Sequence, residues 1–206
     1  MNGIDAYLDR LASADPTPGG GSAATIVGAL GAALIAMVAR ITAQSERYAA
    51  VRDEAETLVE AADVLRERFE AARQIDESAY GRVVAAMALP KGTEGEKQIR
   101  TAELQAALRE AAEAPLVVAG MSAEGFLLAE RAAGLGNVHL VSDVESAVHF
   151  FRAALAASIA NVRINHRFLK DPAFVSAQEE RLVAIFSAAE ESAKRALARI
   201  GGSSAR

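Results

Sequence analysis

Asp76 and Tyr80 are spaced so that both side chains can act on one reacting group. They lie four residues apart in a segment with helical periodicity, which places them on the same helix face. A carboxylate beside a phenol can accept a proton and return it, which is what general acid–base catalysis requires. Lys91, in the tight Pro90–Thr93 turn, is a further candidate acid. The alternative interpretation is that these groups are only solvated, as most charged side chains are.

A glycine-rich segment, Pro16–Ser22, leads directly into an uncharged apolar run. Gly19, Gly20 and Gly21 leave the backbone bare, and Ser22 is a residue type that caps helix N-termini. Backbone amides and the positive end of a helix dipole together favour an anion. The segment therefore predicts an anion-binding loop, with a plain capped turn as the alternative. No Gly-Lys-Ser/Thr follows it and no strand pattern precedes it, which excludes a P-loop and a dinucleotide fingerprint.

Three polar residues, Asp143, Asn161 and Asn165, share one stripe of a long predicted helix. Asp143 precedes Asn161 by five helical turns, which is about 27 Å of rise. Within one chain the two side chains therefore cannot both touch one small reacting centre. Asp143 and Asn161 could meet at one centre only if a partner chain supplied one of them. The alternative is that Asp143, beside the predicted cap Ser142, only stabilises the helix N-terminus through the helix dipole.

Composition excludes several classes of function. The chain carries a net charge of −5, whereas nucleic-acid binding requires a basic face, so we expect no nucleic-acid partner. There is no cysteine, which excludes disulfides, thiolate catalysis and cysteine-ligated zinc, and fits a cytoplasmic protein. The first residues lack the basic start and apolar core of a signal peptide, so we expect none. The uncharged stretch 23–39 is dominated by alanine and glycine and lacks an aromatic belt, so we expect no membrane span.

Metal and nucleotide cofactors are not expected either. His139, His149 and His166 do not have the spacing of metal ligands, and no HExxH motif is present. There is also no Gly-x-Ser-x-Gly motif to support a serine nucleophile. The expected cofactor content is therefore none.

Hydrophobic periodicity predicts a single all-α domain of seven or eight helices over residues 1–206, with a frayed tail at 203–206. The apolar helix from Ser22 to about Ser45 is expected to be central and buried. Its stripe of Gly28, Gly31 and Ala32 lets another helix come close, and its apolar faces predict a homodimer. The other expected helices span 4–11, 47–73, 75–89, 94–112, 115–133, 142–169 and 172 to just before 201.

These features together resemble the formiminotransferase-cyclodeaminase C-terminal domain family, which includes stand-alone methenyltetrahydrofolate cyclohydrolases. The resemblance covers about residues 4–170. It departs at Val138–Val141, where the family usually continues Gly-Asn-Pro-Asn, and at His166, where leucine is common. A formiminotransferase half is not expected, because 206 residues leave no room for it. The matching segments are Pro16–Ser22, Gly28–Leu34, Met37-Val38, Asp76 with Tyr80, Leu89–Thr93, Glu96, Arg100, Ala114–Leu116, Gly136-Asn137, Ser142-Asp143 and Asn161–Asn165.

The resemblance implies an all-helical dimer acting on a folate that carries a one-carbon unit at the oxidation level of formate. A cyclohydrolase opens 5,10-methenyltetrahydrofolate with water to 10-formyltetrahydrofolate. A cyclodeaminase closes 5-formiminotetrahydrofolate to the methenyl compound and expels ammonia. A stand-alone chain favours the cyclohydrolase. The alternatives from other classes are a non-catalytic dimer that binds a folate or an acidic metabolite, and a structural scaffold.

Either reaction needs a carboxylate near the transferred carbon and an acid for the departing nitrogen. Asp143 is the first choice for the carboxylate and Asp76 the second, with Lys91 or Tyr80 as the acid. The residues expected to bind substrate are Gly19, Gly20, Gly21, Ser22, Arg40, Asn137, Ser142, Asn161, Arg163 and Asn165.

Overall fold

The structure is a computed structural model that describes residues 3–204, and in that range every regular element is a helix. This confirms the all-α prediction. The number of α-helices is six rather than seven or eight, with two short 3₁₀ segments. The elements are α1 (Ile4–Leu11), α2 (Gly20–Gln44), η1 (Glu46–Val51), α3 (Arg52–Met87), α4 (Glu94–Gly134), η2 (Val138–Leu140), α5 (Val141–His166) and α6 (Pro172–Ser204).

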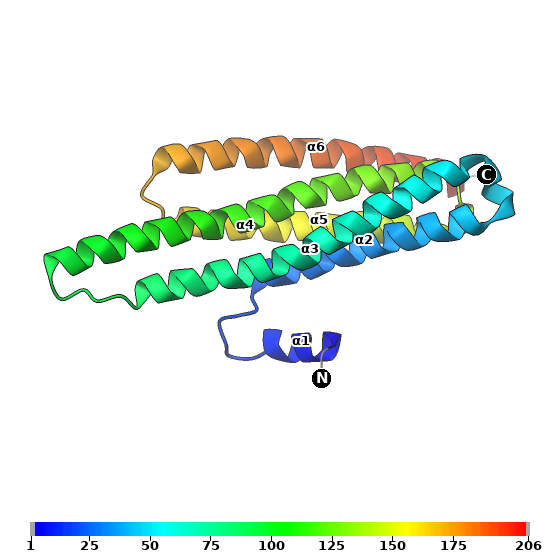
Figure 1. Cartoon of the computed structure of the whole chain (residues 1–206). Helices are drawn as coiled ribbons and strands as arrows, with labels where there is room; N and C mark the ends of the chain where they lie inside the picture. The colour runs from blue at the N-terminus through cyan, green and yellow to red at the C-terminus, as the bar shows by residue number, and fades with distance from the viewer. Residues whose placement is uncertain (1–2, 205–206) are drawn as a thin grey trace.

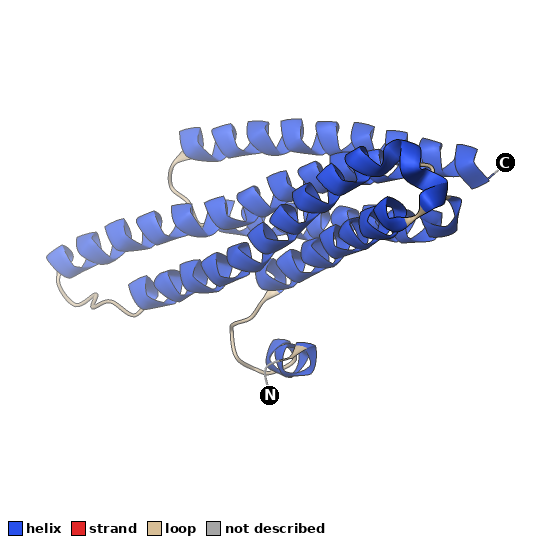
Figure 2. Cartoon of the chain, turned by 45° about the vertical axis from the view of Figure 1, so that its right-hand side comes forward, coloured by secondary structure: helices blue, strands red, loops and turns tan. Residues whose placement is uncertain are grey.

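The five long helices form an elongated bundle, and the short α1 stands beside it (Figures 1 and 2). α2 packs against α3, α4 and α5, and α6 covers α4 and α5. The hairpin of α3 and α4 extends past the point where α2 begins (Figure 1). The N-terminus of α2 therefore lies part-way along the bundle, among three other helices.

Two predicted helix breaks do not occur. α3 runs unbroken through residue 74, because no glycine or proline lies near that position to stop it. α4 likewise continues through Pro115, which is buried inside the helix. Proline has no N–H for the carbonyl of Ala111, but the Nδ2 of Asn165 donates to that carbonyl at 2.9 Å. A side chain from α5 thus satisfies the group that proline leaves unpaired, and the helix persists.

The predicted helix ends also need correction. α2 begins at Gly20, with Gly19 at the N-cap, so Ser22 lies inside the first turn and is not the cap. α5 begins at Val141 without a side-chain cap, so Ser142 is not a cap either. α6 passes through glycines 201 and 202 as far as Ser204, because glycine weakens a helix without removing a donor. Of the predicted frayed tail, residues 205–206 lie outside the described range. Thr93 is the N-cap of α4 and forms a capping box with Glu96.

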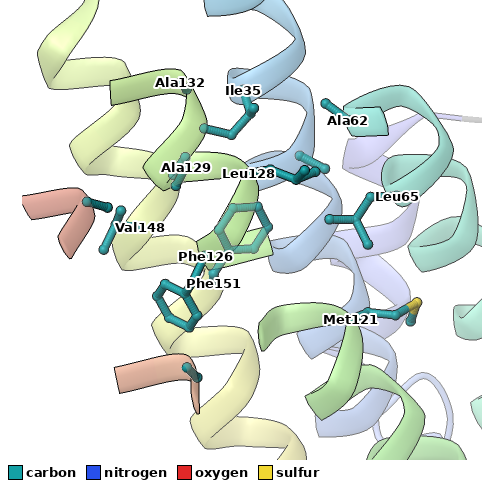
Figure 3. Packing of buried hydrophobic residues seen from close by; sticks show 14 of the residues in the cluster. Ile35, Ala62, Leu65, Met121, Phe126, Leu128, Ala129, Ala132, Val148 and Phe151 are labelled. Atoms are coloured by element: carbon teal, nitrogen blue, oxygen red, sulfur yellow. The ribbon is translucent and has the colours of Figure 1, made fainter. Parts of the chain in front are cut away.

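Small residues on α2 and α4 make room for phenylalanine rings. A Cβ at Gly28 would lie 2.5 Å from Cζ of Phe69, and a Cβ at Gly31 would lie 2.8 Å from Cε1 of Phe151. Gly125 of α4 faces the other side of the Phe151 ring, where a Cβ would lie 2.5 Å from Cδ1. Figure 3 shows this ring beside Phe126, with the ring centroids 6.0 Å apart and the planes at 64°.

The glycine stripe of α2 is therefore filled by rings of its own chain, from α3 and α5, and carries no argument for a dimer. α2 is also not buried all around, since Leu30 is 48% exposed and Ile41 is 45% exposed. Both α2 and α4 are long and apolar enough to cross a membrane by length and composition, but more than half of each apolar window is buried inside the bundle. Burial of that kind is typical of the core helices of soluble proteins.

Replacing Gly28 tests this packing directly. We expect Gly28→Ala to destabilise the fold by about 1–3 kcal/mol, because the new methyl group overlaps the ring of Phe69. Gly120→Ala, also inside a long helix, is the matched control. A Cβ there meets nothing within 4 Å, so a gain of about 0.5–1 kcal/mol is expected. Urea unfolding of both variants measures the difference, and equal stabilities would contradict this account.

Candidate functional site

Some of the site residues predicted from the sequence line a cavity of about 360 Å³ where the N-terminus of α2 meets α3, α4 and α5. One side of it is polar and the other is apolar. The polar side is formed by Gly19, Gly20, Gly21, Asp76, Glu77, Asn161 and Asn165 together with Pro16 and Thr17, and the apolar side by Tyr80, Val83, Met87, Leu108, Ala111, Pro115, Ile164 and Phe168.

The glycines of this site allow side chains of other helices to approach the backbone of α2 closely. A Cβ on Gly21 would lie 2.6 Å from Cγ of Asp76, and one on Gly20 would lie 3.3 Å from Nδ2 of Asn161. Both residues have helical backbone conformation, so their value lies in the absence of a side chain. The first turn of α2 can therefore rest directly on a carboxylate of α3 and an amide of α5.

Asp76 is the carboxyl group that this geometry changes most. Its side chain is half-buried, and burial raises its pKa above the usual value for aspartic acid, helped by the negative charge of Glu77. The backbone N–H of Ser22 donates to it and opposes this rise. Asp76 is thus a carboxylate inside a cavity, with a raised affinity for protons and one hydrogen bond from a helix N-terminus.

Behind Asp76 a chain of hydrogen bonds occupies Ser22 and Glu77. The hydroxyl of Tyr7 donates to Oγ of Ser22 at 3.0 Å, and Ser22 donates to Oε1 of Glu77 at 3.0 Å. Glu77 also pairs with Arg73 at 2.9 Å and with Arg10 at 3.5 Å. The buried Ser22 hydroxyl is therefore engaged by Tyr7 and Glu77, and Ser22 does not line the cavity. The same bonds attach α1 to the bundle.

Asn161 and Asn165 project from α5, and the amide of each donates to backbone carbonyls. Asn161 donates through Nδ2 to the carbonyl of Ala157 at 2.8 Å. Asn165 donates to the carbonyls of Ala111 and Asn161, each at 2.9 Å. These bonds fix both side chains and leave each Oδ1 as an acceptor at the cavity. The pairing of Asn161 and Asn165 at one site, predicted from the sequence, agrees with this arrangement.

Several predicted site residues lie at the other end of the bundle. Asn137 is buried there and donates to Oγ1 of Thr42 at 3.0 Å, which joins the α4–α5 connection to the end of α2. Arg40 pairs with Asp63 of α3. Neither residue lines the cavity, because each is committed to a contact near the C-terminal end of α2.

Asp143 and Ser142 share that location, in the first turn of α5. Asp143 is half-buried and Ser142 is exposed. Both are separated from Asn161 by the length of α5, as the helical rise predicted. One chain does not bring Asp143 to the cavity, so a catalytic role for Asp143 would require a partner chain.

Arg163 and Lys91 also lie outside the cavity. Arg163 points to α6, where it contacts Glu179 at 3.1 Å and, with His166, holds the pKa of that carboxyl below its usual range. Lys91 is exposed in the connection between α3 and α4. Of the four predicted catalytic residues, the structure brings Asp76 and Tyr80 together at the cavity.

Sequence reasoning missed Glu77 and Phe168. Glu77 follows Asp76 directly, and nothing in the sequence signals its bond to Ser22. Phe168 had a usable signal, because residues 161, 165 and 168 recur at helical spacing on the stripe that carries the two asparagines. Within residues 3–204 no cluster of three or more His, Cys, Asp or Glu side chains is arranged to hold a metal ion.

Comparison with known proteins identifies a family. The model of the formiminotransferase-cyclodeaminase family matches residues 3–184. Methenyltetrahydrofolate cyclohydrolase of Methylorubrum extorquens is 40% identical to this chain over 179 residues, which are 87% of this chain and 85% of that protein. Formimidoyltransferase-cyclodeaminase of Rattus norvegicus is 27% identical over 190 residues, 92% of this chain but 35% of the rat protein.

A solved structure agrees with the sequence comparisons. The crystal structure of formiminotetrahydrofolate cyclodeaminase from Thermotoga maritima superimposes with a TM-score of 0.87 at 31% identity. The match covers 97% of this chain and 96% of that chain. The helical arrangement described above is therefore shared along the full length of both chains.

The bond between Asn165 and the carbonyl of Ala111 generates a test of the site's framework. Asn165→Ala should cost about 1–3 kcal/mol, because it leaves a buried carbonyl unpaired beside Pro115. In a Pro115→Ala background the cost should shrink, since residue 115 then has an N–H that can pair with that carbonyl. Urea unfolding of the two single variants and the double variant measures the coupling. Equal costs of Asn165→Ala in both backgrounds would show that the amide does not substitute for the missing N–H.

Proposed function

Because the chain belongs to the formiminotransferase-cyclodeaminase family, we propose that it is a folate one-carbon enzyme, a methenyltetrahydrofolate cyclohydrolase that converts 5,10-methenyltetrahydrofolate and water to 10-formyltetrahydrofolate. The observation that carries this proposal is the Asp76 carboxylate, whose pKa is raised by burial in a cavity beside the bare first turn of α2. The 40% identical relative that bears this name supports the choice of reaction.

In the proposed reaction Asp76 acts as the general base. Asp76 takes a proton from water while the water oxygen bonds to the methenyl carbon between N5 and N10. The bond from that carbon to N5 then breaks, N5 receives a proton, and the hydroxyl on the carbon loses its proton to become the formyl oxygen. One proton is released overall. The negative charge of Asp76 also stabilises the cationic substrate.

The other polar groups of the cavity have supporting roles in this proposal. Tyr80, one helical turn from Asp76, is positioned to protonate N5, with Lys91 as the alternative acid if the α3–α4 connection moves. The Oδ1 atoms of Asn161 and Asn165 accept hydrogen bonds from the N–H groups of the pterin ring. The free amides at Gly20 and Gly21 face an oxygen of the substrate.

A second candidate is formiminotetrahydrofolate cyclodeaminase, favoured by the 31% identical structure that covers nearly the whole chain. There N10 attacks the formimino carbon, loses its proton to the carboxylate, and ammonia departs after protonation. The tetrahedral carbon is held between the same two nitrogens, so one site suits both reactions. A site that binds folate without turnover is the remaining alternative.

Incubating the protein with 5,10-methenyltetrahydrofolate and following the loss of its absorbance tests the proposal, with the uncatalysed rate subtracted. A parallel assay with 5-formiminotetrahydrofolate follows ammonia. We expect turnover of the first substrate to persist after exhaustive chelation and without nicotinamide, because each step is a proton transfer or an addition. Saturable binding without turnover of either substrate would contradict an enzymatic function.

Asp76→Asn should lower kcat by about 10²–10⁴-fold, the range typical of removing a general base. Activity of the unchanged enzyme should rise as the pH increases through the pKa of Asp76. That pKa lies above the usual aspartic acid value of about 3.9. A raised folded-state pKa also means that ionised Asp76 disfavours folding as pH rises through that pKa. Asp76→Asn should therefore be at least as stable as the parent at neutral pH, with the difference vanishing in acid.

Asp143→Asn is the control for this variant. Asp143 and Asp76 are both half-buried aspartates on helices, but Asp143 lies at the other end of the bundle. We expect Asp143→Asn to retain near-normal turnover and Asp76→Asn to lose most of its turnover. The reverse pattern would return the catalytic role to Asp143 and require a partner chain to bring it to the reacting carbon.

We also propose a cytoplasmic homodimer. Its support is a stripe of Leu30, Leu34, Met37 and Ile41 at helical spacing on α2, whose first and last members are nearly half exposed. A second copy of the same helix can cover this stripe. The surface is apolar and uncharged, which suits a permanent contact between like subunits.

Leu30→Glu tests the dimer, because it places a charge at an exposed end of the stripe, and Leu30 does not line the cavity. Sedimentation velocity at micromolar concentration should give a dimer for the parent chain and a monomer for the variant. Val183→Glu, at an exposed position on α6, is the control and should stay dimeric. A monomeric parent chain would overturn the proposal.

A further inference from the structure

Four large apolar side chains stand exposed around the mouth of the Asp76 cavity. Tyr80 is 42% exposed, Ile164 45%, Met87 48% and Phe168 59%. All four line the cavity, although they come from α3, α5 and the α5–α6 connection. Apolar groups gathered at a cavity that also holds a few fixed polar groups are typical of a ligand-binding surface.

The backbone on both sides of Phe168 forms hydrogen bonds with the side chain of Gln105. Gln105 of α4 donates through Nε2 to the carbonyl of Phe168 at 3.0 Å and accepts through Oε1 from the N–H of Lys170 at 2.7 Å. Leu169 packs against a small apolar cluster between α3 and α4 that includes Val83 and Leu108. The backbone on both sides of the ring is therefore anchored, while the ring itself is mostly in solvent.

A second contact keeps the same connection against α4. Arg109, one helical turn after Gln105, pairs with Asp171 at 2.6 Å and lies over the ring of Phe174. Asp171 in turn accepts from the backbone N–H groups of Ala173 and Phe174. The start of α6 and the end of α5 are thus held together at this edge of the cavity.

An exposed aromatic ring on an anchored backbone is prepared for contact with a ligand, because little conformational freedom remains to be lost on binding. We propose that Phe168, together with Tyr80, contacts the flat ring system of the substrate, and that Gln105 is the positioning residue that holds Phe168 there. The identity of the ring as a folate rests on the proposed function. The ring contact itself requires only a planar aromatic ligand whose reacting part reaches Asp76.

This role predicts an effect on binding rather than on chemistry. Phe168→Ala should raise KM and the Kd for 5-formyltetrahydrofolate roughly tenfold or more, because an aromatic contact and its buried area are lost, while kcat changes little. Gln105→Ala should raise both constants in the same direction. In the double variant the two effects should not add, since Gln105 acts through Phe168.

The chain has no tryptophan, so Phe168→Trp introduces a single fluorescent reporter at the proposed contact. Acrylamide quenching of its emission, measured with and without 5-formyltetrahydrofolate, should fall several-fold when the ligand is bound. Phe186→Trp is the matched control, because Phe186 is 49% exposed on α6 and does not line the cavity. Its quenching should not change.

The outcomes separate this inference from the proposed reaction. Shielding at position 168 but not at 186, with no turnover by the parent enzyme, would retain the ring contact and refute the cyclohydrolase activity. Turnover together with equal quenching of the indole with and without ligand would overturn the ring contact. So would a Phe168→Ala variant that binds 5-formyltetrahydrofolate as tightly as the parent, or a parent chain that does not bind it.

Discussion

The direct contact between the first turn of α2 and the polar side chains of α3 and α5 is the constraint on which the site depends. Gly20 and Gly21 have no Cβ, so Asn161 and Asp76 occupy the space where side chains would otherwise be. A helix start is usually capped by a side chain, but here Gly19 provides none. The carboxylate of Asp76 accepts from the Ser22 N–H instead. The helix end and the carboxylate thus satisfy each other in part, and both remain open to the cavity.

Around this contact, the bundle satisfies its polar groups without consuming the ones that face the cavity. Pro115 removes an N–H from α4, and Asn165 supplies the missing donor to Ala111. That bond fixes the amide of Asn165 so that its oxygen is the free end. Asn161 is fixed in the same way by its own helix. The side chains of Asp76, Asn161 and Asn165 therefore offer acceptors to the cavity, which complement the N–H groups and positive charge of a ligand.

Much of this could be predicted from the sequence, and the misses have physical causes. The helical class was predicted correctly. Of the candidate site residues, Gly19–Gly21, Asp76, Tyr80, Asn161 and Asn165 line one cavity, whereas Asp143, the first choice for the carboxylate, does not. Pro115 was predicted to begin a helix, because the Asn165 amide that pairs with the Ala111 carbonyl lies 54 residues from Ala111, in α5. Ser22 was predicted as a cap, because its partners Tyr7 and Glu77 are likewise distant in sequence. Short sequence patterns predict hydrogen bonds between residues that are close in sequence. These errors arose where a hydrogen bond between distant residues replaced a local one.

The surroundings of Glu77 explain how two adjacent acidic residues can differ in role. Glu77 accepts from Ser22 and pairs with Arg73 and Arg10, so its charge is largely compensated by fixed neighbours. Within residues 3–204 no cationic side chain forms an ion pair with Asp76, and burial raises its pKa. A carboxylate that must take a proton from water and then release it works best when its pKa approaches the working pH. Because Glu77 is engaged by Ser22, Arg73 and Arg10, Asp76 is the carboxylate of the cavity that is available, with a raised pKa, to meet a cationic carbon.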